Sequence, residues 1–91
     1  NLSGANLAGA RLPDAMLTIA KLVGTDLRGT NLSGANLSAA NLGAANLGHA
    51  NFRGAILTYA NLATANLDGA KFDGADLHGA SLPDDQARAE E

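Results

Sequence analysis

Hydrophobic residues return at every fifth position along this chain. From position 2 to position 82, every fifth residue is leucine or phenylalanine, which makes 17 positions without exception. An α-helix cannot use this period, because five residues at about 100° each move successive leucines around the helix axis and leave no continuous apolar face. The pattern therefore excludes an amphipathic helix.

Each five-residue unit instead predicts a short strand followed by a corner. Residues 45–47 (Ala-Asn-Leu) alternate inward, outward and inward, as a strand does. The second residue after the leucine or phenylalanine is glycine nine times, and Pro13 and Pro83 follow such a leucine directly. These are the preferences of the two central positions of a type II turn. Because every corner bends the chain in the same direction, we expect a solenoid whose successive coils stack about 4.8 Å apart.

The number of units in one coil follows from the pairs that stacking would create. A coil of four units places Phe52 on Phe72 and Arg53 beside Asp73. A coil of three units pairs Arg53 with Asp68 but separates the two phenylalanines. We therefore favour four units. This spacing predicts a core ladder of inward-pointing residues, namely Leu7, Leu27, Leu47 and Leu67, with Phe52 and Phe72 beside it.

The units resemble those of the pentapeptide-repeat family, whose pattern is A(D/N)LXX. Residues 35–39 (Ala-Asn-Leu-Ser-Ala) and 75–79 (Ala-Asp-Leu-His-Gly) are examples, and the resemblance covers residues 1–84. It implies an all-β fold, a right-handed quadrilateral β-helix of about four coils, with leucine, phenylalanine and alanine pointing inward. Residues 85–91 are expected to form a charged C-terminal tail or a short cap. The outward Asn/Asp slot departs from the pattern at Arg11, Met16, Lys21, Ile56, Lys71 and Ser81.

Composition narrows the classes of protein that remain. The chain has no cysteine, which excludes disulfides and cysteine-based metal sites. No apolar run approaches the length of a membrane span, and no signal peptide is evident, so we expect a cytoplasmic protein that does not contact a membrane. Because the chain begins at Asn1 in phase with the repeat, we expect it to be a processed product or a piece of a longer protein.

Candidate chemistry is sparse. His49 and His78 fall at corner positions and are expected to face solvent, without the cysteine or His–acid spacing of a metal site. The glycines are corner residues and not a phosphate-binding loop. We therefore predict no catalytic, metal or cofactor-binding residues and no enzymatic activity. The outward asparagines are expected to form amide ladders between coils, such as Asn41 with Asn61.

The resemblance also implies one specific alternative function, because some pentapeptide-repeat proteins imitate the DNA duplex and bind type II topoisomerases such as gyrase. A mimic of DNA needs regular negative charge along its whole length. Here, residues 1–67 carry four basic and two acidic residues, a net charge of +2, whereas residues 68–91 carry two basic and seven acidic residues, a net charge of −5. We therefore favour a non-enzymatic structural or protein-interaction scaffold that binds an unidentified protein and no nucleic acid directly. DNA mimicry is the alternative.

One group of outward residues is a candidate interaction face. Stacking by four units gathers Met16, Ile19, Ile56 and Tyr59 on one wall, and Tyr59 is the candidate aromatic anchor for a partner or a second copy. Single apolar residues are also normal on protein surfaces. The alternative is therefore that these four residues are ordinary surface residues and bind no partner. The coil ends are a second candidate for self-association, because a solenoid end exposes strand edges and an apolar cross-section.

Overall fold

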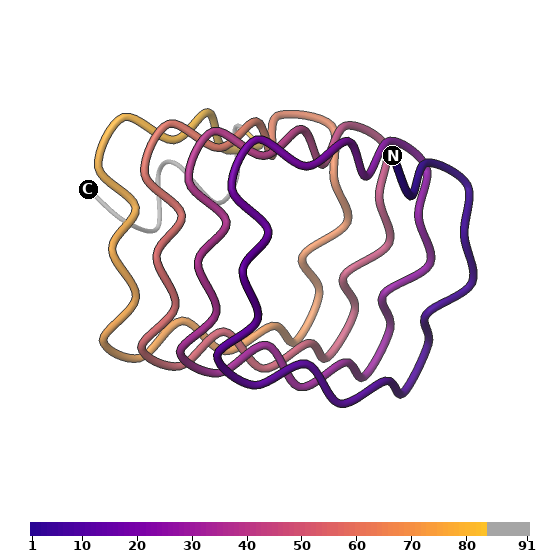
Figure 1. Cartoon of the computed structure of the whole chain (residues 1–91), viewed down its shortest axis with the longest axis horizontal. Coiled ribbons are helices and arrows are strands. Elements are labelled where there is room, and N and C mark those ends of the chain that lie inside the picture. The colour runs from indigo at the N-terminus through magenta and orange to yellow at the C-terminus, as the bar shows by residue number, and fades with distance from the viewer. Residues whose placement is uncertain (84–91) are drawn as a thin grey trace.

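The chain winds through successive coils that stack along the long axis of the molecule, as Figure 1 shows. This computed structural model describes residues 1–83, so our predictions for residue 84 and for the tail or cap at 85–91 lie outside the described residues. Within residues 1–83 there is no helix and no strand longer than one residue. The regular structure consists of twelve isolated parallel bridges, from Asn6↔Asp26 to Asn61↔Ser81.

Every bridge joins a residue to the equivalent residue four units later. This offset defines a coil of four units and excludes the three-unit coil. The pairs expected from it are present, since the Phe52 and Phe72 rings stack with centroids 5.1 Å apart and an interplanar angle of 2°. In addition, Arg53 Nε lies 3.3 Å from Asp73 Oδ2. The right-handed sense of the coil stays a prediction.

Backbone hydrogen bonds connect each coil to the next and close each corner. The Leu47 N–H donates to the Asn66 carbonyl of the following coil at 2.8 Å, and the Asn46 N–H donates to the Thr25 carbonyl of the preceding coil at 3.0 Å. Within a corner, the Ala50 N–H donates to the Leu47 carbonyl at 3.0 Å. The His49 N–H also donates to the Asp68 carbonyl of the following coil at 2.8 Å. Repetition of these four bonds joins the coils without an extended strand.

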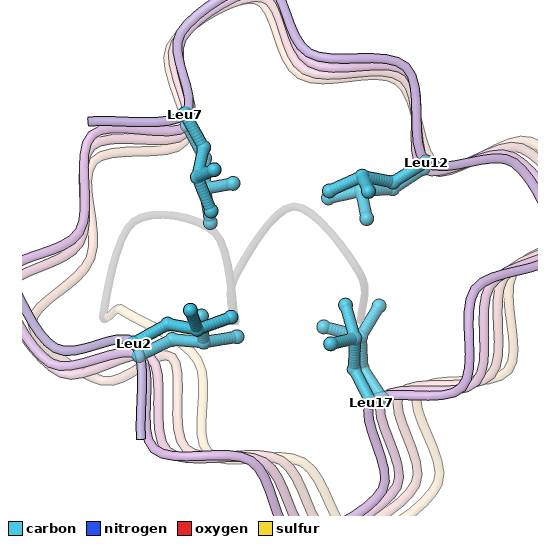
Figure 2. A pocket seen from close by; sticks show the side chains of 8 residues that line it. Leu2, Leu7, Leu12 and Leu17 are labelled. Carbon is cyan, nitrogen blue, oxygen red and sulfur yellow. The ribbon is translucent and has the colours of Figure 1, made fainter. Parts of the chain in front are cut away.

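The core lies on the axis of the coil, and its side chains are most completely buried in the middle coils. Leucine and phenylalanine side chains from the four sides point toward one another, as the leucines of the first two coils do in Figure 2. Leu27, Leu47 and Phe52 are fully buried, and Leu67 is nearly so. Leu7 and Phe72 are half-buried, because each belongs to a coil near one end. Burial therefore falls from the middle coils toward both ends.

The outward asparagines and aspartates have a second role that the sequence did not reveal. The Asn46 Oδ1 accepts the backbone N–H of Gly48 at 3.1 Å, and the same bond over two residues recurs at ten other Asn or Asp positions. Each such bond satisfies the first N–H of a corner. The amide ladders are also confirmed, since Asn61 Nδ2 donates to Asn41 Oδ1 at 3.3 Å and Asn66 Nδ2 donates to Asn46 Oδ1 at 3.2 Å.

Candidate interaction face

Four units stack to form one wall of the coil, which we call the Tyr59 wall: residues 16–20, 36–40, 56–60 and 76–80, counted as rows one to four. Its rows are joined by the parallel bridges Met16↔Asn36, Asn36↔Ile56 and Ile56↔Asp76. The wall therefore holds all four residues of the candidate interaction face. Met16 and Ile19 lie in the first row, and Ile56 and Tyr59 lie in the third.

These four side chains are the main exposed apolar surface of the described residues. Met16 is 77% exposed, Ile19 71%, Tyr59 66% and Ile56 39%. The other large hydrophobic residues exposed within residues 1–83 are Leu2, at the first coil, and Val23. Clustered apolar exposure on a single wall is a mark of interaction surfaces in soluble proteins.

The Tyr59 wall also lacks charge over most of its length. Its first three rows contain no acidic or basic residue, and the fourth adds Asp76 and His78. The opposite wall, formed by residues 6–10, 26–30, 46–50 and 66–70, carries Asp26, Arg28, His49 and Asp68. Interface centres are depleted of charged residues, so the Tyr59 wall has the composition expected of a protein-binding surface.

Two of the four residues occupy backbone conformations in which glycine is usual. Ile19 and Tyr59 are the second corner residues of their units and have φ values of 59° and 60°. Nine glycines occupy the same corner position with positive φ, and so do four small or polar residues, Asp14, Ala39, Ala44 and His49. For a residue with a side chain this left-handed conformation costs about 1–2 kcal/mol, and it is rare for β-branched residues such as isoleucine. The chain thus carries large apolar side chains at positions where its own backbone favours glycine.

Contacts within the wall hold the centre of this surface in place. The Tyr59 ring lies over Gly79 in the next row, where an added Cβ would overlap the ring. It also meets the edge of the His78 ring, with centroids 5.7 Å apart and an interplanar angle of 86°. Between the second and third rows, the hydroxyls of Ser38 and Thr58 form a hydrogen bond of 2.8 Å.

The first coil presents a different apolar feature at the end of the core. The four leucines of this coil converge on the axis around a hollow of about 90 Å³, and the leucines of the second coil lie behind them (Figure 2). Leu2 is 40% exposed there. The lining residues are Leu2, Leu7, Leu12, Leu17, Leu22, Leu27, Leu32 and Leu37. An apolar end of this kind was expected, and its role in self-association stays a prediction.

The remaining polar groups form local contacts on the outer surface. On the opposite wall, Arg28 Nη2 lies 2.7 Å from Asp26 Oδ2. Hydrogen bonds from the Arg28 side chain, and then from its backbone N–H, lower the pKa of the Asp26 carboxyl. Within residues 1–83, no group of three or more His, Asp or Glu side chains is placed to hold a metal ion. That part of the chain also contains no helix of the length and apolarity that a bilayer crossing requires.

Coils of four five-residue units, an axial core of leucine and alanine, and corners braced by asparagine define the class of β-helical repeat proteins. The family profile described as pentapeptide repeats (8 copies) matches residues 1–34, 35–72 and 45–84. The chain therefore belongs to the pentapeptide-repeat family.

Two solved structures show the same fold. HetL, from the cyanobacterium Nostoc sp. strain PCC 7120, is 39% identical, with a TM-score of 0.69 over 91% of this chain and 43% of HetL. Rfr23, from the cyanobacterium Cyanothece 51142, is 37% identical, with a TM-score of 0.53 over 88% of this chain and 58% of Rfr23. The chain thus spans less than two thirds of either relative. No curated protein matches its sequence.

Proposed function

We propose that this chain is a non-enzymatic interaction scaffold that binds a protein partner through the Tyr59 wall. The observation that carries the proposal is the placement of Ile19 and Tyr59 at positive-φ corners, where their side chains cost conformational energy and are largely exposed to solvent. The three uncharged rows support the same conclusion. HetL is a pentapeptide repeat protein involved in heterocyst differentiation regulation, and a regulatory role of that kind suits a protein-binding rod.

DNA mimicry ranks below this function because of the distribution of charge. Within the described residues, acidic side chains gather in the last coil, where Asp68, Asp73 and Asp76 outnumber Lys71. Residues 1–67 have a net charge of +2, so a continuous stripe of carboxylates along the rod is not available. A gyrase supercoiling assay with the purified protein separates the two functions. Inhibition at micromolar protein would favour the mimic, whereas unchanged supercoiling favours the scaffold.

The scaffold function is tested by photo-crosslinking in the cells that produce the protein. A benzophenone amino acid replaces Thr58 at the centre of the Tyr59 wall, or Asp68 on the opposite wall as the matched control. We expect discrete protein adducts from position 58 and none from position 68. Tyr59→Arg, added to the position-58 variant, should abolish the adducts because it places a charge at the centre of the apolar face. Equal adduct patterns from the two walls would contradict the proposal.

A further inference from the structure

Side chains at several positive-φ corners lie over the same corner of the next coil. Within residues 1–83, a Cβ added to glycine would overlap the side chain of another corner residue at three positions. In each pair the covering residue precedes the glycine by one coil. The three pairs, each on a different wall, are Asp14 over Gly34, His49 over Gly69 and Tyr59 over Gly79.

A glycine that follows another glycine by one coil is not covered in this way. Such residues, which have φ values of 68°, 64° and 68° and no atom within 4 Å of an added Cβ, are Gly24, Gly29 and Gly54. The corner conformation alone therefore does not fill this space, whereas a side chain from the preceding coil does. Ile19, the remaining positive-φ residue larger than alanine, is followed one coil later by Ala39. A side chain at this corner thus uses space that a small residue leaves free in the next coil.

We propose that Gly79 is a positioning residue of the Tyr59 wall, which holds the Tyr59 ring in the orientation that a partner meets. The ring lies over Gly79 and contacts the edge of the His78 ring in the same row. Supported in this way, Tyr59 is still 66% exposed. An aromatic side chain that is fixed before binding loses less conformational entropy when a partner contacts it. Gly79 therefore strengthens binding through Tyr59. This inference rests on the proposed function and adds a residue that acts through Tyr59 on the same wall.

Gly79→Ala combines two effects, which a double-variant cycle with Tyr59→Ala separates. It strains a corner with a φ of 72°, and it places a Cβ where the Tyr59 ring lies. We expect Gly79→Ala to lower the urea midpoint, and to lower it by less when residue 59 is alanine. Gly54→Ala is the matched control, because its φ is 68° and its Cβ enters open space. Its midpoint shift should be the same in both backgrounds. Equal shifts by Gly79→Ala in the two backgrounds would refute the positioning role.

The orientation of the ring can be followed directly, because Tyr59 is the only tyrosine of the chain and there is no tryptophan. The anisotropy of intrinsic fluorescence therefore reports the mobility of this ring. We expect a lower anisotropy in Gly79→Ala, because the ring can no longer lie against the next row. Gly54→Ala should leave the anisotropy unchanged, since a loss of stability elsewhere does not move the ring. Circular dichroism at the same temperature verifies that both variants are folded. Unchanged anisotropy in folded Gly79→Ala would overturn the proposal.

Photo-crosslinking from position 58 connects the position of the ring to binding. Gly79→Ala, added to the position-58 benzophenone variant, should reduce the yield of protein adducts, and Gly54→Ala should not. An undiminished yield with Gly79→Ala would refute the positioning role, whereas the scaffold function would stand. If the position-58 variant forms no adducts even with Gly79 intact, the scaffold function is refuted, and the positioning role for a partner is refuted with it.

Discussion

Truncation of Leu47 to alanine tests the axial core most directly. Leu47 is 0% exposed and belongs to the column of Leu27 and Leu67, one coil to either side. Its coil is bonded on both sides, since the Leu47 N–H donates to Asn66 and the Asn46 N–H donates to Thr25. The backbone therefore cannot collapse into the space that the substitution leaves. Leucine-to-alanine changes at such sites cost about 2–5 kcal/mol, and the constraint from both neighbours puts Leu47→Ala at about 3–4 kcal/mol.

Leu2→Ala is the matched control at the open end of the same core. Leu2 is 40% exposed and borders the hollow of the first coil, so its truncation removes less buried area and should cost about 1 kcal/mol. Urea denaturation followed by circular dichroism gives both values from the shift of the midpoint at constant slope. If Leu47→Ala destabilises the protein by no more than Leu2→Ala does, the burial gradient along the rod has no energetic meaning and the reasoning fails.

Three further changes probe the corners and the surface. Gly79→Ala should destabilise the protein by about 2–3 kcal/mol, because it adds a Cβ at a φ of 72° and under the Tyr59 ring. Asn46→Ala should cost about 0.5–1.5 kcal/mol by removing the acceptor of a corner N–H, measured by urea denaturation. Asp26→Asn should change how the free energy of unfolding depends on pH in the acid range. Because Arg28 lowers the pKa of Asp26 in the folded protein, the carboxylate stabilises the fold above the unfolded pKa of about 3.9. That stabilisation is lost as the pH falls through the lower pKa that Asp26 has in the folded state. The difference in free energy of unfolding between wild type and Asp26→Asn should therefore narrow in that pH range.

Controls for these changes exist within the same repeat. Gly54→Ala also adds a Cβ at positive φ, 68°, but into open space, so it should cost about 1 kcal/mol and less than Gly79→Ala. Arg11→Ala changes the Asn/Asp slot of a unit whose first corner residue is Pro13, which has no N–H to satisfy. It should leave stability unchanged, whereas an effect equal to that of Asn46→Ala would refute the bracing role of asparagine.

The period of five is enough to predict the inside of this fold. Once leucine or phenylalanine is assigned to the axis, the stacking of Phe52 on Phe72 selects an offset of four units, and the same offset collects Met16, Ile19, Ile56 and Tyr59 on one wall. These conclusions need only strand alternation and a constant corner. Both can be recognised from the spacing of residue types along the sequence.

The side-chain geometry of the surface could not be predicted in the same way. The sequence predicts an amide ladder for the asparagine slot. The more frequent bond of this slot goes to the backbone two residues later, a contact that depends on the turn conformation. The Tyr59 ring lies over Gly79, the equivalent position one coil later, and both residues have positive φ. One signal was available in the sequence: glycine is replaced at this corner position by several residues, and among the replacements only Ile19 and Tyr59 are large and apolar.

The constant offset of four units has a consequence for how this chain tolerates insertions and deletions. An added block of four units would lengthen the rod by one coil and return every later residue to its original side. A single added unit between positions 20 and 55 would preserve the repeat and the core, yet it would turn Ile56 and Tyr59 a quarter of the way around the axis from Met16 and Ile19. Gene duplications of any whole number of units are thus compatible with folding, but only those in multiples of four keep the surface that the apolar residues share.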